Sequence, residues 1–181
     1  MEYRNYSSEG IILARKNYSE ADRILTVFTK HFGKVSLLAK GIRKPKSRKR
    51  GHLEVFSHIK FSASGGGNLD LMQEAETIES FSGIRSNLKK IAVAYFFVEV
   101  TTKLTRENEK HEELFLFLND YLNRLKGAKS LKELRFQFVH DTLSSLGFWP
   151  RQKLMGDPDR ILREITEREI SSARVGKRIL T

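Results

Sequence analysis

The chain has 181 residues, of which 39% are hydrophobic and 30% are charged, so it can bury a core in one domain or two small ones. It contains no cysteine, which excludes disulfides, a thiol nucleophile and any zinc site built on thiolates. Its formal net charge of +11 predicts a polyanionic partner, either nucleic acid or an anionic membrane surface. No apolar run is long enough to span a bilayer and no signal-peptide pattern is present, so we expect a soluble, intracellular protein without a membrane partner.

The first 80 residues have the pattern of short strands. We predict strands at residues 11–14, 23–30, 35–39, 53–62 and 69–79. Between the second and third strands, residues 31–34 predict a turn with Gly33 at a positive φ. Five short strands in so few residues favour a small barrel over a sandwich.

One segment, residues 40–50 (KGIRKPKSRKR), carries the whole positive excess of this part of the chain. It contains seven basic residues and no acidic one, and without them residues 1–80 would be net negative. Gly41, Pro45 and Gly51 disfavour regular structure, so we predict a loop that is mobile until it meets an anion. A phosphate-contacting loop is the favoured interpretation; a solvated loop or a localisation-like basic tract is the alternative. The candidate DNA contacts in this loop are Lys40, Arg43, Lys44, Lys46, Arg48, Lys49 and Arg50.

Alternation along residues 53–62 places Phe56, His58 and Lys60 on one strand face, opposite an apolar face. An aromatic ring beside cations is the arrangement on which barrels of this size stack single-stranded bases. We therefore predict Phe56 and Lys60 as further nucleic-acid contacts. The alternative is that Phe56 packs against the helical part of the chain. The sequence leaves the role of Tyr18 open.

After Ser80 the spacing of apolar residues becomes helical, which predicts a bundle that follows the barrel. The first stripe consists of Ile84, Leu88, Ile91, Tyr95, Val98 and Thr102, and the second of Leu114, Leu118, Tyr121, Leu122 and Leu125. Ser130 and Glu133 match a capping box at the start of a third helix, which Gly147 would end. Asp157 and Pro158 predict the start of a fourth helix.

The residue patterns indicate no catalytic site, no metal site and no cofactor. The chain has no phosphate-binding P-loop, no nucleophile elbow and no metal-ligand spacing among its five histidines. Glu74, Glu76 and Glu79 lie close together, so a metal-dependent nuclease is the enzyme alternative. Alternation on a polar strand face explains these three carboxylates without chemistry.

Several ordered motifs resemble the bacterial RecO recombination mediators. The motifs are residues 18–26 (YSEADRILT), Phe28-Thr29, Gly33-Lys34, residues 39–43 (AKGIR), Pro45 and Ser47-Arg48. The resemblance implies an α+β multidomain protein, with an N-terminal five-stranded OB-fold β-barrel at residues 1–80 and an α-helical bundle domain at 81–181. Carried over position by position, it implies DNA contacts at Arg23, Lys34, Lys40, Arg43, Lys44 and Arg48.

The same resemblance implies a function and a set of partners. Proteins of this family bind single- and double-stranded DNA, anneal complementary strands, pair with RecR, contact the acidic C-terminal tail of the single-stranded-DNA-binding protein (SSB), and help load RecA. A cytoplasmic, nucleoid-associated bacterial protein is therefore expected. Two departures stand out: many relatives carry a four-cysteine zinc module, which is absent here, and relatives usually extend beyond position 181. Candidates for the tail-binding pocket are Arg124, Lys126 and Arg135.

The main rival interpretation is an OB-fold RNA-binding or ribosome-associated factor. Barrel, charge and basic loop would have the same sequence pattern in such a protein, because phosphates carry no sequence information. The residues alone therefore leave the choice between DNA and RNA open.

Overall fold

The computed structural model describes residues 5–44, 53–65, 69–167 and 170–172. The chain divides into two compact units, which are described separately. The first unit comprises Met1–Ser80 and Thr105–Phe115, and the second comprises Phe81–Leu104 and Leu116–Thr181. The sequence-based division placed Thr105–Phe115 with the helices, whereas the structure assigns this segment to the barrel unit.

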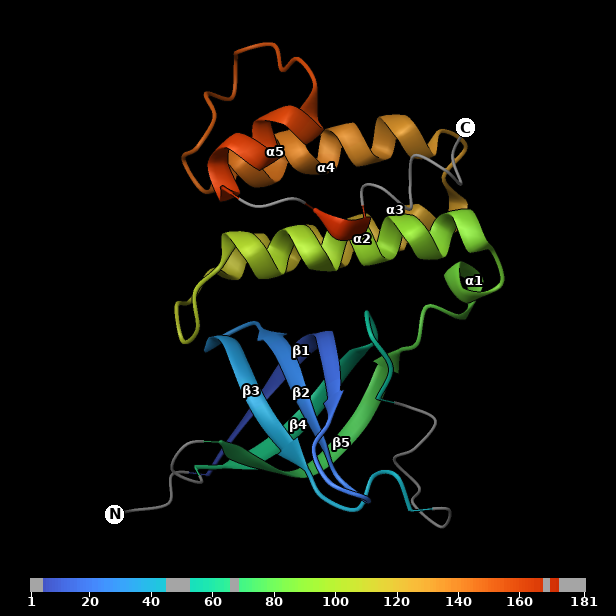
Figure 1. Ribbon diagram of the computed structural model, residues 1–181, viewed down its shortest axis with the longest axis vertical. Coiled ribbons are helices and arrows are strands. Elements are labelled where there is room, and N and C mark those ends of the chain that lie inside the picture. Colours follow the sequence, from blue (N-terminus) through green and yellow to red (C-terminus); the bar gives the residue numbers. More distant parts are fainter. Residues whose placement is uncertain (1–4, 45–52, 66–68, 168–169, 173–181) are drawn as a thin grey trace. The chain divides into compact units, whose positions relative to one another are not determined.

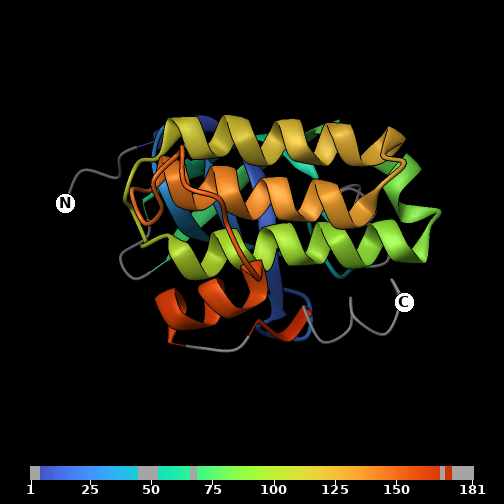
Figure 2. The same ribbon diagram turned by 90° about the horizontal axis from the view of Figure 1, so that it is seen from above.

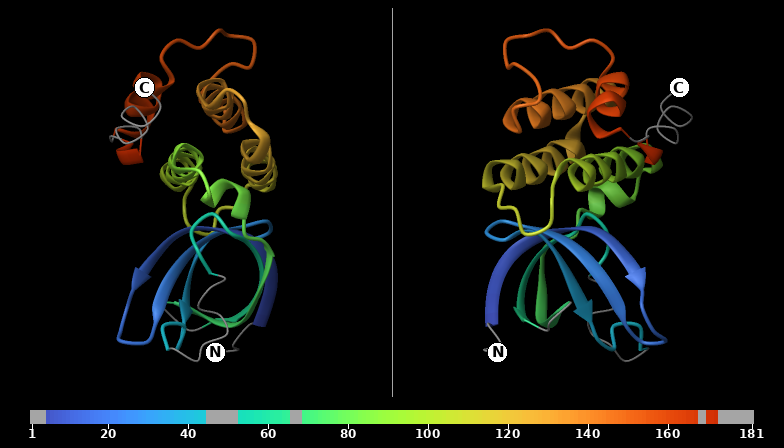
Figure 3. Two further views of the ribbon diagram at one scale, coloured as in Figure 1. Left: turned by 90° about the vertical axis from the view of Figure 1, so that its right-hand side faces the viewer. Right: turned by 60° about the vertical axis from the view of Figure 1, so that its left-hand side comes forward.

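The first unit is built on a closed five-stranded barrel (Figures 1 and 3). Its strands are β1 (Asn5–Asn17), β2 (Arg23–Thr29), β3 (Gly33–Ala39), β4 (His58–Ser64) and β5 (Asp70–Glu79). The strand order around the barrel is β1-β2-β3-β5-β4, and only the β3–β5 pair is parallel. This is the arrangement of a five-stranded Greek-key barrel, so the predicted fold class is confirmed.

Alternating apolar residues fill the barrel. Leu25 pairs with Leu37 and Val27 pairs with Val35 across β2 and β3, and all four side chains are buried. Because side chains alternate along a strand, the residues between them face outward. A bulge between Ile12 and Ala14 bends the long strand β1, which lets one strand pair with both β2 and β4.

The fourth strand differs from the sequence prediction. It begins at His58 rather than at residue 53, because the chain turns at Val55 and Phe56. Phe56 has a φ of 58°, a left-handed conformation that no strand residue adopts. Its backbone N–H donates to the Ile12 carbonyl oxygen at 2.7 Å, and the Ile12 N–H donates to the Ser57 carbonyl oxygen at 3.1 Å. These bonds hold the turn against the bulge of β1.

Thr105–Phe115 packs onto the β2–β3 hairpin. The Asn108 N–H donates to the Lys34 carbonyl oxygen at 2.9 Å, and the Lys34 ammonium donates to the Thr105 carbonyl oxygen at 2.6 Å. The predicted positive φ of Gly33 is confirmed at 69°, and a Cβ atom there would lie 2.1 Å from the Glu109 carbonyl oxygen. Glycine is therefore required here both for its conformation and for the close approach of the two segments.

The second unit is helical, and its three long helices lie side by side (Figure 2). Its elements are α1 (Ser82–Arg85), α2 (Leu88–Leu104), α3 (Glu112–Gly127, whose first turn belongs to the barrel unit), α4 (Leu131–Ser145) and α5 (Pro158–Thr166). Phe97, Tyr121 and Phe138 meet in its core, with ring centroids 4.2–5.9 Å apart. None of the helices in the described ranges is long and apolar enough to cross a membrane.

The predicted helix stripes have mixed outcomes. All five residues of the second stripe, on α3, are buried as expected. The first stripe is wrong for Leu88 and Tyr95, which are 67% and 44% exposed. Helix α2 buries residues on several of its sides, including Val93 and Phe96, so a single stripe does not describe it.

The predicted helix ends are confirmed. The Ser130 hydroxyl accepts the Glu133 N–H at the start of α4, and the Asp157 carboxylate accepts the Asp159 N–H at the start of α5. Gly147 follows α4 with a φ of 77°. These local signals could be read from the sequence because each depends on side chains within a few residues of the helix end.

Candidate nucleic-acid interface

The start of the basic segment is fastened to the β1–β2 turn. The Gly41 N–H donates to Oδ1 of Asp22 at 2.8 Å, and the Arg43 N–H donates to the Ala21 carbonyl oxygen at 2.9 Å. The Arg43 guanidinium donates to the Ser19 carbonyl oxygen at 2.7 Å. We call the two segments Tyr18–Asp22 and Lys40–Lys44 together the loop end of the barrel.

The braces at the loop end use backbone groups rather than cation–carboxylate pairs. Asp22 accepts a backbone N–H, and Arg43 donates to a backbone carbonyl. Lys40 and Lys44 are exposed, and neither forms an ion pair with any residue that the structure describes. The positive φ of Gly41, 66°, turns the chain between them. The loop end therefore presents two exposed lysines that no described carboxylate holds in an ion pair, although Glu20 and Asp22 lie in the same loop end.

The rest of the basic segment, residues 45–50, is not among the described residues. It contains Lys46, Arg48, Lys49 and Arg50. Their assignment as DNA contacts stays a prediction from the sequence.

Two predicted contacts on the hairpin already have protein partners. Nε of Arg23 donates to Oδ1 of Asn17 at 3.2 Å, across the ends of β1 and β2. The ammonium of Lys34 is bound to the Thr105 carbonyl, and burial lowers the pKa of Lys34 although Glu107 opposes this shift. Arg23 thus lies beside the loop end, whereas Lys34 holds the Thr105–Phe115 segment.

Lys60 lies on the barrel wall between two acids. It is exposed on β4, and its directly opposite neighbours are Glu9 on β1 and Glu76 on β5. Opposite residues in antiparallel strands have Cβ atoms about 4.5–5.5 Å apart, so both acids are close cross-strand neighbours of Lys60, and the Glu9 carboxylate lies 3.4 Å from Nε2 of His58. Lys60 therefore lies between acids of two neighbouring strands, and it does not share a strand face with Phe56, because Phe56 precedes β4.

The barrel unit exposes the aromatic side chain of Tyr18 and not that of the predicted Phe56. Phe56 is 1% exposed, so its ring presents no face for stacking, because the left-handed turn removes it from the strand surface. Tyr18, whose role the sequence left open, is 61% exposed and lies in the loop end. The position of Tyr18 beside the charged β1–β2 turn was visible in the sequence. Its exposure could not be predicted, because residues in a turn have no regular spacing that separates buried from exposed positions.

The acidic residues of β5 form no metal site in the described structure. Glu74 and Glu76 are exposed along the strand, and Glu79 is half-buried. Across the part of the chain that the structure describes, no group of three or more His, Asp or Glu side chains is arranged to hold a metal ion.

Two basic residues of the helical unit, Arg135 and Lys126, take part in its packing. Arg135 forms an ion pair with Asp159, and its guanidinium carbon lies 3.9 Å from the centroid of the Phe96 ring. The Lys126 ammonium lies 5.1 Å from the centroid of the Phe81 ring. Arg135, a candidate for an acidic-tail pocket, thus has a largely buried side chain that is paired with Asp159.

Comparisons with known proteins give the same family for both units. Residues 1–81 match the family model described as Recombination protein O N terminal, and residues 85–153 match Recombination protein O C terminal. The chain is 33% identical over 145 residues to the DNA repair protein RecO of Pelotomaculum thermopropionicum, in an alignment that covers 80% of this chain and 56% of the relative. It is 31% identical over 169 residues to that of Roseiflexus sp., covering 93% and 59% of the two chains. The chain therefore spans less than two thirds of the length of these relatives.

Proposed function

The chain belongs to the RecO family of recombination proteins, and on this premise we propose that it binds single- and double-stranded DNA through the loop end of its barrel in DNA repair and recombination. The observation that carries the proposal is the loop end itself. Hydrogen bonds join the start of the seven-cation segment to the β1–β2 turn, and Lys40 and Lys44 are exposed beside them. Such cations bind phosphates by releasing counterions, without regard to base sequence.

We propose further that this binding promotes annealing of complementary strands. Two strands repel each other through their phosphates, and a cationic segment that contacts both lowers the repulsion and raises their local concentration. No nucleotide hydrolysis is needed for this step, because the energy comes from charge neutralisation and base pairing.

Family membership supports a wider role, which we also propose. With RecR, the protein would help load RecA onto strands coated by SSB, whose acidic C-terminal tail it would contact. An assay that anneals SSB-coated complementary strands, with and without RecR, tests this role. No acceleration over the coated strands alone would contradict it.

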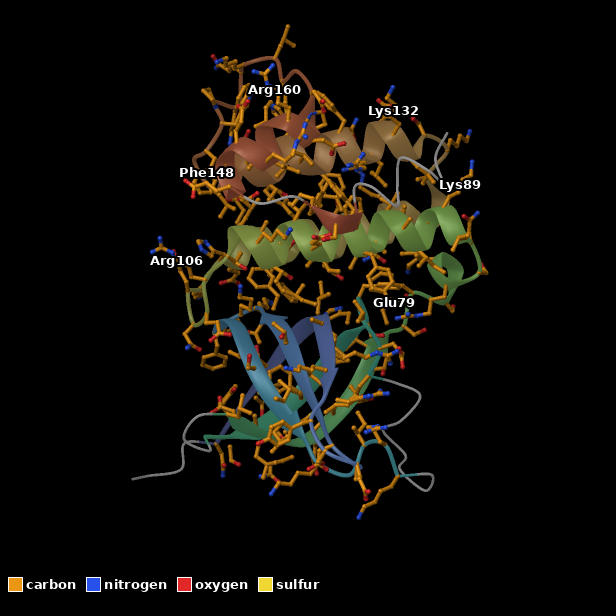
Figure 4. The ribbon with its side chains drawn as sticks, in the orientation of Figure 1. Glu79, Lys89, Arg106, Lys132, Phe148 and Arg160 are labelled. Carbon is orange, nitrogen blue, oxygen red and sulfur yellow. The ribbon has the colours of Figure 1, made fainter. Side chains whose placement is uncertain are left out.

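A matched pair of triple variants tests the DNA-binding proposal. The first replaces Lys44, Lys46 and Lys49 by Ala, and the second replaces Lys89, Lys129 and Lys132, three exposed lysines of the helical unit, by Ala. Figure 4 labels Lys89 at the start of α2 and Lys132 at the start of α4. Both variants lose the same charge, so they separate a local contact from the general field of the protein.

The loop variant should bind a mixed-sequence single strand about 10- to 100-fold more weakly at 0.1 M salt, and its log–log salt slope should shrink by about 2. The control variant should stay within about threefold of the parent chain. Equal losses in both variants would contradict binding at the loop end. Tighter binding of RNA than of DNA in competition would favour the RNA-binding alternative.

A further inference from the structure

Tyr18 is the most exposed aromatic side chain in the described part of the chain, at 61%, against 51% for Phe148 and 44% for Tyr95. It follows β1 directly, and its N–H donates to the Asp22 carbonyl oxygen at 3.2 Å, which closes the β1–β2 turn. The backbone of Tyr18 is therefore fixed while its ring stays accessible. The large Tyr18 ring is therefore exposed on an ordered turn, so binding a ligand there would cost little backbone conformational entropy.

The turn that carries Tyr18 is the one to which the basic segment is braced. Ser19, next to Tyr18, accepts the Arg43 guanidinium, and Ala21 accepts the Arg43 N–H. The ring and the first cations of the segment are thus held on one frame within the barrel unit. A nucleic-acid strand whose phosphates contact Lys40 and Lys44 would pass within reach of the Tyr18 ring.

Three apolar residues lie in a row on the outer surface of the sheet at the same end of the barrel, next to Lys16 on β1. Leu25 and Leu37 face the core, so their neighbours Ile24 and Leu38 face outward, where they pair across β2 and β3 and are half-exposed. Leu38 also pairs with the half-exposed Leu71 on β5. This row offers apolar surface to bases and sugars beyond the ring.

We propose that Tyr18 is a stacking platform for an unpaired base and makes the loop end prefer single-stranded over double-stranded DNA. The inference rests on the proposed function and names the form of DNA that this site selects. Cation–phosphate contacts alone do not favour the single strand, because both forms carry phosphates and the duplex has the higher charge density. An aromatic ring does favour it, because bases in a duplex are already stacked on each other, whereas single-strand stacking on a side chain is worth about 1–3 kcal/mol per base.

The test compares Tyr18→Ala and Tyr18→Phe in the full chain, with Tyr95→Ala as an exposed-tyrosine control from the helical unit. Binding is measured on a mixed-sequence single strand, on the same strand with abasic sites throughout its central part, and on the corresponding duplex. The abasic strand keeps the phosphates and removes the stacking partner.

Tyr18→Ala should weaken single-strand binding about 5- to 100-fold. It should change binding to the duplex and to the abasic strand less than about twofold, and the retained duplex binding also shows that the variant is folded. Tyr18→Phe and Tyr95→Ala should stay within about twofold on all three. Equal effects of Tyr18→Ala on single strand and duplex, or no effect on either, would overturn the platform. A parent chain that binds none of the three would instead overturn the proposed function.

Discussion

Arg135 of the helical unit and the lysines at the loop end of the barrel have opposite surroundings. In the helical unit, the side chains of Arg135 and Asp159 pair with only 13% and 10% of their surface exposed. At the loop end, Asp22 accepts a backbone N–H, and Lys40 and Lys44 are exposed. The difference teaches that the net charge of +11 has two parts, one that holds the fold and one that is open to an anion.

The largest expected effect comes from breaking the buried pair. Arg135→Ala removes the cation that is paired with the buried Asp159 carboxylate, so the free energy of unfolding should fall by about 3 kcal/mol. DNA binding below the unfolding transition should stay unchanged. Urea unfolding followed by circular dichroism measures the first quantity. Arg135→Lys should lose less, because it keeps the charge but not the planar stacking on Phe96. A stable Arg135→Ala variant with weakened DNA binding would show instead that Arg135 contacts DNA and does not stabilise the fold.

The next effect compares two exposed lysines of the barrel unit itself. Lys44→Gln should weaken binding to single-stranded DNA about fivefold at 0.1 M salt, the value of one phosphate contact. Lys60→Gln should change it less than about twofold, because Glu9 and Glu76 lie opposite it on the neighbouring strands and repel phosphates there. Fluorescence anisotropy with a labelled oligonucleotide resolves the two. Equal losses would show that cross-strand acids do not decide which cations bind.

A smaller effect separates charge from bracing at Asp22. Asp22→Asn keeps an oxygen that accepts the Gly41 N–H but removes a negative charge, so DNA should bind about two- to threefold more tightly. Asp22→Ala removes the charge and the acceptor together, so its affinity should be lower than that of Asp22→Asn. If the two variants bound alike, the brace would contribute nothing to the interface.

The smallest effect is a dependence of stability on pH. Burial lowers the pKa of His58, although Glu9 and Glu79 oppose the shift and Lys30 adds to it. The unfolded chain therefore takes up a proton near the ordinary histidine pKa of about 6.5, whereas His58 in the folded barrel is protonated only at lower pH. The free energy of unfolding should therefore be highest above about pH 6.5 and should fall as the pH drops below that value. Thermal unfolding between pH 5 and 7.5 measures the slope. His58→Gln should flatten it, and an unchanged slope would assign the dependence to other groups.

Much of the fold could be predicted from the sequence, because many of the signals are local. The apolar alternation of β3, the five-residue stripe of α3, the caps at Ser130 and Asp157 and the positive φ of Gly33 all depend on neighbours in the chain. Helix α2 is the exception, because it is buried on several sides and its periodicity therefore carries little information about which side faces water.

The candidate site was harder to predict because its decisive features are not local. Residue type and spacing placed Phe56 on a strand, but a left-handed turn buries it. The ammonium of Lys34 is bound by a carbonyl 71 positions away, and Lys60 is flanked by acids from two other strands. Whether a cation is open to a ligand depends on such partners, which only the folded chain brings together.

The interleaving of the two units along the chain limits how they can be dissected. A fragment that stops at Ser80 would lack Thr105–Phe115, and with it the acceptor of the Lys34 ammonium and the Phe115 ring, which lies 6.4 Å from that of Phe28. Such a truncation would expose apolar surface on the β2–β3 hairpin. It would also remove the Glu109 backbone that packs against Gly33. A minimal soluble version of the barrel would therefore need the missing eleven-residue strap grafted back, for example through a short flexible linker after Ser80.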